Sequence, residues 1–433
     1  MGKLFIDEKG PQENFKISSP FNIEEKLAYG TDIMHGYVAN AWHISDKLDQ
    51  FTEEFVELEK SYLKTLQNPN VELKGSTVLK KRFKNGVTSL RSKDVEFYTA
   101  LFKLLIKYKS KNLLFSVNKM SIIFDSRLLE WIYLLEEKRM IRNAYLTKYT
   151  LTKYLDTEAS EEVIKTILDL NTNSKEILNE IQKDMQNIVN SNKKNKRMKN
   201  QIEEYKQIIA IIRTSKHFIV ETPEKITFDW NKVTFAMDLW ITDNKLSGII
   251  DPHSTDVYLD NGINKSHFEK FGFNSISENV DSKNNAGIRV TDLLVAIAGN
   301  YIKSLHQGSK YNRNEPEKTK RLSEDFFNLT KEQFNLLKLM NRFFFSSGQY
   351  SIVTDTFFDD EGIFEAFLNY VDQFDTFEKY KMIRNKIHVE EQFKLTSFYF
   401  HDRWAKSLEN DVIVKKLFAS TKNAVELGAL RPL

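Results

Sequence analysis

The chain has 433 residues, of which 41% are hydrophobic and 28% charged, and its formal net charge is +3. These values exclude a disordered chain and a polycation, so a surface that binds nucleic acid must be a local patch. The absence of cysteine excludes disulfides, thiol catalysis and cysteine-bound zinc or iron–sulfur clusters. With only 15 Gly and 7 Pro, the composition favours long helices over a fold rich in tight turns.

The N-terminal residues, MGKLFIDEKG, carry acids where a signal peptide would be apolar. No apolar run approaches the roughly 18 residues that a membrane-spanning helix needs. We therefore expect a soluble, cytoplasmic protein that does not contact a membrane.

The first quarter of the chain contains short strands and longer helices. Residues 3–7, KLFID, are an apolar run that ends in acids just before Gly10 and Pro11, which predicts a buried strand closed by a turn. The same reasoning predicts strands at 15–18 and 112–119, and apolar periodicity predicts helices at 22–67 and 93–109.

The middle of the chain is predicted to be helical. From 126 to 213 apolar residues recur at spacings of three and four, and two such runs, 177–188 and 202–212, flank a basic segment. This pattern predicts an antiparallel helical hairpin with a basic tip. The basic residues of the tip are Lys193, Lys194, Lys196, Arg197 and Lys199.

Mixed character returns after the hairpin. Residues 246–251, LSGIID, predict a strand that ends in an acid, and 287–305 predict a helix. Beyond a polar stretch at 307–320 the pattern is helical to the end. The expected domains are an α/β core formed by 1–125 and 226–307, a helical insertion at 126–225 and an all-helical C-terminal domain at 308–433.

Three acids stand out by their positions. Asp7 and Asp251 each end a predicted strand, and Asp292 lies beside the buried face of the helix predicted at 287–305. An ionised carboxylate beside a buried face is costly unless it is paired or binds a metal. Each acid also has a plain structural interpretation, as a turn residue for Asp7 and Asp251 and as a helix-dipole partner for Asp292. Taken one at a time, both interpretations stay open.

Four segments together resemble one known family. They are FIDEKG at 5–10, ELKGS at 72–76, FSVNK at 115–119 and DSKNNAGIRVTDLLVAIAG at 281–299. Their order and rough spacing are similar to the bacterial and phage family catalogued as domain of unknown function 3800, which has Asp-Glu-x-Gly, Glu-x-Lys and then Asp-Ser-Lys before Ala-Asp-Leu-Leu. Thr291 replaces the Ala of the last motif and leaves the acid intact. The resemblance covers about 1–125 and 226–306.

The resemblance implies a ribonuclease-H-like fold, which is a mixed five-stranded sheet flanked by helices. It also implies a nuclease site in which carboxylates hold two divalent ions for phosphodiester hydrolysis. Carried over by position, the ligands are Asp7, Glu72, Asp251 and Asp292, with Glu8 as an alternate. Hard oxygen ligands suit Mg²⁺ or Mn²⁺.

Basic residues near these motifs are candidates for contact with phosphate. The resemblance gives Lys283 a role at the phosphate or the developing charge, and Lys74 a similar one. A basic patch near Glu72 and the tip of the hairpin could bind a nucleic-acid backbone without reading its sequence. The residues of that patch are Lys80, Lys81, Arg82 and Lys84. Plain solvated charge is the alternative interpretation for all of these residues.

The expected function is therefore metal-dependent hydrolysis of DNA or RNA, associated with anti-phage defence or a mobile element. The alternative is a non-catalytic module that senses nucleic acid or protein, with the helical additions docking a protein partner or a second copy. A third hypothesis is a metal-independent ribonuclease centred on Arg384 and His388, although their spacing is one residue too short for that motif. The chain has neither a Gly-x-x-x-x-Gly-Lys loop nor a Gly-x-Ser-x-Gly elbow, which disfavours an ATPase and an α/β-hydrolase.

Overall fold

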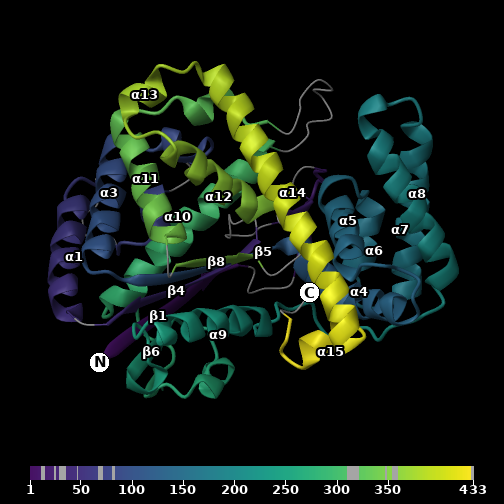
Figure 1. Cartoon of the computed structure of the whole chain (residues 1–433), viewed down its shortest axis with the longest axis horizontal. Helices are drawn as coiled ribbons and strands as arrows, with labels where there is room; N and C mark the ends of the chain where they lie inside the picture. Colours follow the sequence, from purple (N-terminus) through teal and green to yellow (C-terminus); the bar gives the residue numbers. More distant parts are fainter. Residues whose placement is uncertain are drawn as a thin grey trace.

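The structure is a computed structural model with mixed α/β architecture, and it describes most of the chain (Figure 1). The described residues are 1–10, 15–23, 26–28, 36–45, 47–66, 72–79, 83–309, 321–346, 349–353 and 359–430. A central sheet carries helices on both faces, and a group of helices stands at one side of it. No helix in this part of the chain has the length and apolar character needed to cross a membrane.

The central sheet has six strands in the described residues, in the order β7-β6-β1-β4-β5-β8. Strand β4 is antiparallel to β1 and to β5, whereas β6, β7 and β8 pair in parallel with their neighbours. The strands are β1 (Gly2–Lys9), β4 (Gly36–Ile44), β5 (Lys111–Asn118), β6 (Thr255–Leu259), β7 (Ser275–Ser277) and β8 (Tyr350–Val353). Two short strands, β2 (Lys16–Ile17) and β3 (Leu27–Ala28), form a separate antiparallel pair.

The two faces of the sheet differ in what covers them. Because successive strand residues point to opposite faces, Leu4 and Ile6 lie on one face and Phe5 and Asp7 on the other. The Leu4 face packs on α9, and the Phe5 face packs on α10 and its neighbours. Figure 1 shows α9 on the opposite side of the sheet from α10 and α11.

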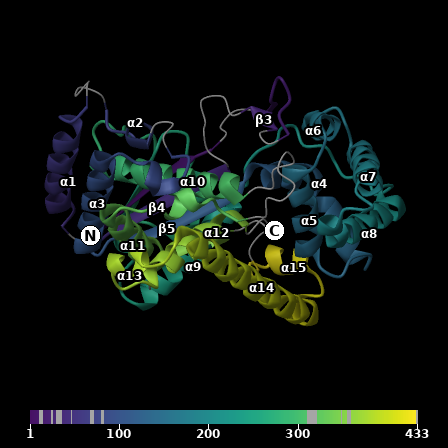
Figure 2. The ribbon, with the colours of Figure 1, turned by 90° about the horizontal axis from the view of Figure 1, so that it is seen from above.

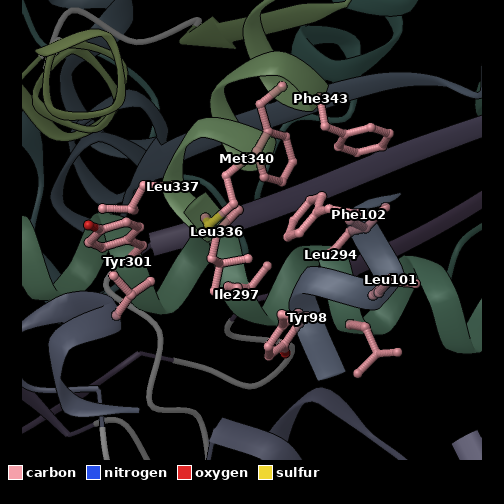
Figure 3. Packing of buried hydrophobic residues seen from close by; sticks show 14 of the residues in the cluster. Tyr98, Leu101, Phe102, Leu294, Ile297, Tyr301, Leu336, Leu337, Met340 and Phe343 are labelled. Atoms are coloured by element: carbon pink, nitrogen blue, oxygen red, sulfur yellow. The ribbon is translucent and has the colours of Figure 1, made fainter. Parts of the chain in front are cut away.

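The large core on the Phe5 face is built mainly of aromatic and aliphatic side chains from α3, α10 and α11 (Figure 3). Tyr98, Phe102, Ile297 and Met340 are fully buried there. The helices of this layer are α1 (Leu48–Leu63), α2 (Gly75–Leu79), α3 (Ser92–Lys107), α10 (Ala286–Ser309), α11 (Lys331–Phe345) and α12 (Asp359–Asp372), and α9 (Asn231–Leu246) covers the other face. Short 3₁₀ turns are η1 (Gly86–Ser89), η2 (Lys196–Met198), η3 (Pro252–Ser254), η4 (Lys265–His267), η5 (Glu269–Phe271) and η6 (Glu324–Phe327).

The helices of the insertion have a hydrophobic core of their own. They are α4 (Lys119–Glu137), α5 (Ala144–Thr157), α6 (Glu161–Leu168), α7 (Ser174–Ser191) and α8 (Lys199–Ser215). Their apolar residues recur at three and four positions, so each helix presents one stripe to its neighbours. Figure 2 shows these helices grouped on the side of the molecule away from α1 and α3.

The C-terminal segment connects the core to the insertion. It contains α13 (Phe377–Lys381), α14 (Asn385–Phe418) and α15 (Thr421–Glu426). Helix α14 leaves the core and crosses the front of the molecule, and α15 lies beside α4 (Figure 1). There the buried carboxylate of Glu136 accepts hydrogen bonds from the backbone N–H and the hydroxyl of Thr421, at 3.0 and 2.8 Å.

Most of the predicted elements are confirmed. The strands at 3–7 and 112–119, the helices at 93–109 and 287–305 and the antiparallel hairpin are all present. The strand at 15–18 is present only as the short β2, which pairs with β3 and not with the central sheet.

Three expectations are wrong. The helix predicted at 22–67 begins only at Leu48, because 36–44 is the central strand β4, which is buried from both sides and so lacks an alternating pattern. Residues 246–251 are the end of α9 and a loop, since Gly248 with φ of 67° stops the helix, and the strand follows at Thr255–Leu259. The C-terminal part is not all-helical, because β8 pairs with β5.

The contact between α12 and α14 predicts a pH-dependent stability. Arg403 forms ion pairs of 2.9 Å with both Glu361 and Glu365. Burial and the charge of Glu361 raise the pKa of Glu365 to about 7 from the ordinary 4.5, so the folded state holds this proton more tightly than the unfolded chain does. Its contribution to stability is therefore full below pH 4.5 and is lost as the pH rises to 7.

Urea unfolding at pH 5 and pH 8 tests this expectation. The wild type should lose about 1 to 3 kcal/mol more stability over this range than Glu365→Gln, because the amide does not titrate. Glu409→Gln, an exposed position on α14, the helix that carries Arg403, is the control and should behave as the wild type does. Parallel pH profiles for wild type and Glu365→Gln would contradict the prediction.

Candidate functional site

Asp7 is a buried carboxylate at the centre of the molecule. It lies on β1, two residues after Phe5, and therefore on the sheet face that α10 covers. The side chain is only 4% exposed. One carboxylate oxygen accepts a hydrogen bond of 2.7 Å from the backbone N–H of Glu8. Glu8 itself projects to the opposite face of the strand, so the structure does not bring the alternate ligand to the same side.

Asp260 stands next to Asp7 at the end of the neighbouring strand. Strand β6 pairs in parallel with β1, and the backbone N–H of Asp260 donates to the carbonyl of Ile6 at 3.0 Å, one step beyond the last strand pair. Since Tyr258 packs against the core on the Phe5 face, Asp260 projects to this same face. The two acids therefore lie at the carboxyl ends of adjacent parallel strands.

Asp292 reaches the site from α10, one helical turn after Ile288. Its Oδ1 accepts from the Lys9 ammonium and its Oδ2 from the backbone N–H of Gly75, both at 2.6 Å. Asp292 is partly buried, with a side chain 15% exposed. The carboxylate therefore has a fixed orientation between β1 and α2.

Two glycines allow these elements to approach so closely. A Cβ at Gly287 would overlap the ring of Phe5, and a Cβ at Gly75 would overlap the Cβ of Ala296 and stand 3.0 Å from the carbonyl oxygen of Asp292. Only glycine leaves room for α10 to lie directly on β1 and for α2 to lie on α10. The Gly of ELKGS thus has a steric role as well as a hydrogen-bonding one.

Negative charge accumulates around Asp7. Burial raises the pKa of Asp7 well above its ordinary value, and the charges of Asp292 and Asp260 raise it further, while Lys9 and the N–H of Glu8 oppose the shift. Burial and the charge of Asp292 likewise raise the pKa of the Tyr98 phenol. The Tyr98 hydroxyl is buried and has no hydrogen-bond partner within the described part of the chain. A positive charge bound here would relieve the repulsion among the carboxylates.

Glu72 lies beside the Asp281-Ser282-Lys283 segment. Its Oε1 accepts from the Ser282 hydroxyl at 2.6 Å, and its Oε2 lies 3.5 Å from the ammonium of Lys74. The side chain of Lys283 is exposed. The structure thus brings Glu72 to this segment, with no contact that links it to Asp7.

Arg289 holds the same segment in place. One guanidinium nitrogen donates to the carbonyls of Ser282 and Lys283, at 2.7 and 3.2 Å, and the other donates to Glu59 at 3.0 Å. Five donors in a rigid plane suit arginine for this bridging task. Arg289 therefore fixes the backbone that presents Lys283.

Asp251 is not part of the group. It is exposed and precedes β6, whereas Asp7 and Asp260 lie toward the other end of the paired strands. Its backbone carbonyl accepts from the hydroxyl of Thr255 at 2.7 Å. The correction follows from the misplaced strand, because β6 begins four residues after Asp251 and its carboxyl end is marked by Asp260.

The basic patches are only partly described. Lys80, Lys81 and Arg82 lie outside the described residues, and Lys84 is exposed with its backbone carbonyl bound by Ser304 at 2.8 Å. The basic side chains of the hairpin tip are exposed. These are Lys193, Lys194, Lys196, Arg197 and Lys199.

His388 cannot serve as the centre of a metal-independent ribonuclease. Its ring is fully buried, with Nδ1 hydrogen-bonded to the Tyr370 hydroxyl at 2.7 Å and Nε2 to the Tyr380 carbonyl at 3.1 Å. Burial lowers the pKa of His388, so the ring is held neutral in an aromatic cluster. The structure gives His388 a role in the core.

The donors around Asp7 suit a hard divalent cation, although they do not form a complete cage. Among the described residues, no three His, Cys, Asp or Glu side chains lie close enough together to hold one metal ion. Asp7, Asp260 and Asp292 nevertheless supply the carboxylate oxygens that Mg²⁺ and Mn²⁺ prefer. Their mutual repulsion is the observation that favours a cation there.

Comparisons with protein-family models, with curated proteins and with solved structures gave no match.

Sequence reasoning missed Asp260 and Arg289. The signal for Asp260 was present, because 255–260, TDVYLD, is an alternating run that ends in an acid as KLFID does. The strand was predicted instead at the preceding residues 246–251, which also end in an acid. Arg289 carries no such signal, since an arginine within an apolar helix does not reveal which backbone carbonyls it will meet.

The contact between Gly75 and Ala296 predicts a rescue. Gly75→Ala should destabilise the fold by about 1 to 3 kcal/mol, because the new methyl group overlaps Ala296. Ala296→Gly removes that group and should recover about 1 kcal/mol or more in the double variant relative to the sum of the single changes. Urea unfolding of the four proteins measures the coupling.

Ser76→Ala is the control for this cycle, because Ser76 is exposed on the same short helix. It should leave the stability within about 0.5 kcal/mol of the wild type. Strict additivity of Gly75→Ala and Ala296→Gly would mean that the two positions do not touch.

Proposed function

We propose that this chain is a ribonuclease-H-like nuclease that hydrolyses phosphodiester bonds of nucleic acid with the help of Mg²⁺ or Mn²⁺. Strands β7, β6, β1, β4 and β5 are consistent with the mixed sheet that the resemblance to the domain of unknown function 3800 family implies. The proposal keeps the expected association with anti-phage defence or a mobile element.

The electrostatic influence of Asp260 and Asp292 on the buried Asp7 is the observation that carries the proposal. The three carboxylates come from strand β1, the end of its parallel neighbour β6 and helix α10, which packs on β1. Burial raises the pKa of Asp7 well above its ordinary value, and the charges of Asp292 and Asp260 raise it further. A fold gains nothing in stability from such repulsion, and strained titratable groups of this kind concentrate at functional sites.

These three acids are the residues that would hold the cation, and Asp260 replaces Asp251 in the set that the sequence suggested. A bound divalent cation supplies neutralisation of phosphate charge and lowers the pKa of water at the site. In the hydrolysis, a water oxygen forms a bond to phosphorus, the bond from phosphorus to the leaving oxygen breaks, and one water proton passes to that leaving oxygen.

Residues of the chain would prepare the site for this reaction. The N–H of Gly75 and the ammonium of Lys9 orient the Asp292 carboxylate. Arg289 fixes the segment from which exposed Lys283 projects, and Lys74 lies next to Glu72 on the same side. Both lysines are available to contact a phosphate group.

One observation favours the alternative, a non-catalytic binding module. Lys9 lies 2.6 Å from Asp292 Oδ1, so an ammonium already neutralises an oxygen that a metal would use. In that alternative the acids are structural, and the helical additions dock a protein partner. Helix α14, which exposes Leu408, Val412 and Leu417, would be the element that does so.

Cleavage assays on the whole chain test the nuclease. Labelled single- and double-stranded DNA and RNA are incubated with Mn²⁺, with Mg²⁺ or with EDTA. The wild type should cleave at least one substrate only with metal, and Asp7→Asn and Asp292→Asn should each lower the rate by at least about 100-fold. Asp251→Asn is the matched control and should retain the wild-type rate, because Asp251 is exposed and lies away from the other acids.

Two results would contradict the proposal. Cleavage that persists in EDTA and in both variants would assign the activity to another site or to a contaminant. Binding of nucleic acid without cleavage of any substrate under any of these conditions would favour the non-catalytic module.

Binding of Mn²⁺ can be measured without any activity. Thermal unfolding of the wild type should shift upward with Mn²⁺, by an amount that corresponds to about 2.7 kcal/mol at 100 times the dissociation constant. Asp260→Asn should reduce the shift, and Asp7→Asn with Asp292→Asn should abolish it. An equal shift in the wild type and in the double variant would place the ion elsewhere.

A further inference from the structure

A second site lies at the edge of the sheet where β4 ends and β5 begins. Ser45, just after β4, and Lys111, the first residue of β5, line an open cavity of about 940 Å³ there, and β1 starts at this same edge. Asp7 lies toward the opposite end of β1, so the cavity is separate from the carboxylate cluster. Its walls come from the adjacent helices α1, α3 and α11, which Figure 1 shows on one face of the sheet.

The cavity is strongly positive. Among the described residues, five cationic side chains and one carboxylate, that of Glu54, line it. The five are Lys47, Lys107, Lys109, Lys111 and Arg342. Glu54 is already engaged, since its oxygens accept from Lys107 at 2.6 and 2.7 Å and from the Tyr108 hydroxyl at 2.7 Å. A chain whose net charge is only +3 thus concentrates positive charge in one concave place.

The inner part of the cavity is partly shielded from water. Lys111 is half-buried, and burial lowers its pKa, with the charge of Asp243 opposing this effect. Gln349 holds the backbone behind it, since its amide nitrogen donates to the carbonyl of Ser110 at 3.1 Å and its amide oxygen accepts from the N–H of Asn112. A partly desolvated cation with other cations nearby is stabilised further by a bound anion.

The remaining walls suit an organic group attached to that anion. Ile106 and Ile249 line the cavity next to the cations, and both are half-buried. The volume falls in the range of about 300 to 1,000 Å³ that is typical of small-molecule sites. A ligand with several negative charges at one end and a flat apolar group at the other matches both features.

We propose that this cavity binds a nucleoside polyphosphate. Its phosphates lie among Lys109, Lys111 and Arg342, and its base packs against Ile106 and Ile249. Lysine and arginine recognise phosphate through charge-assisted hydrogen bonds, and both are present here. The site is independent of the carboxylate cluster, so its test succeeds or fails regardless of the nuclease activity.

Calorimetric titration of the whole chain tests the site. The probes are ATP in metal-free buffer, inorganic tripolyphosphate, adenosine and a ten-nucleotide single-stranded DNA. ATP should bind with micromolar to submillimolar affinity and more tightly than tripolyphosphate, and its affinity should fall with added salt. The variant Lys47→Gln, Lys109→Gln, Arg342→Gln should bind ATP at least about tenfold more weakly, because two of the proposed phosphate contacts and a third positive charge of the cavity are lost.

A matched variant controls for net charge. Lys175→Gln, Lys183→Gln, Lys206→Gln removes the same number of exposed positive charges on α7 and α8 and should bind ATP as the wild type does. Circular dichroism and thermal unfolding check that both variants fold. If the cavity variant unfolds, Arg342→Gln alone, at an exposed position, gives the same comparison.

Each remaining outcome overturns the proposal. The proposed site is wrong if ATP does not bind at millimolar concentration, or if both charge variants lose the same amount of ATP affinity. Equal affinity for tripolyphosphate and ATP removes the role of the base. If the DNA strand binds more tightly than ATP and this binding is lost in the cavity variant, the cavity is part of a nucleic-acid binding surface and not a nucleotide site.

Discussion

The close approach of α10 to β1 is the constraint on which the rest of the structure depends. Gly287 allows the helix to lie directly on the ring of Phe5, and Gly75 allows α2 to lie on α10 at Ala296. With the helix in this position, Leu294 is buried in the core of the Phe5 face, and the Asp292 carboxylate reaches Lys9 of β1 and the N–H of Gly75. A longer distance between helix and sheet would separate the carboxylates and open the core at the same time.

This arrangement sets a stabilising core against a destabilising group of charges. Burial of large apolar side chains stabilises the fold by roughly 1.5–3 kcal/mol each, and the core that contains Tyr98 and Phe102 has many of them. The carboxylate cluster around Asp7 works in the opposite direction, because it keeps like charges in a buried place. Lys9 and the N–H of Gly75 offset part of that repulsion at Asp292.

The sequence predicts those parts of the fold that have a local pattern. Strand β1 and strand β5 were recognisable as short apolar runs bounded by turns, and α10 by its helical spacing. Strand β4 was not, because both its faces are covered and buried Asn40 and His43 interrupt the apolar run. Strand β8 carries no local mark of its pairing with β5, since a parallel partner is chosen by the tertiary fold.

The residues of the candidate site also divide into those with a local sequence pattern and those placed by the tertiary fold. Asp7 and Asp292 could be found because each lies beside a predicted buried element. The place of Asp260 in the site depends on the register of β6 against β1. Because the strand was predicted too early in the chain, Asp251 was chosen in its stead. The role of Arg289 depends on a loop conformation that no spacing encodes.

Helix α14 gives the molecule a mechanical property that none of its separate parts has. Its 34 residues span about 50 Å, from the core at Arg384 to the insertion, where Thr421 is bound by Glu136. The insertion is thus joined to the core by its two chain crossings and by several non-covalent contacts with α14 and α15, among them the ion pair of Lys422 with Glu130 and the ring contact of Trp404 with Tyr149. A rotation of the insertion relative to the sheet would have to break these contacts, so α14 and α15 resist such a motion.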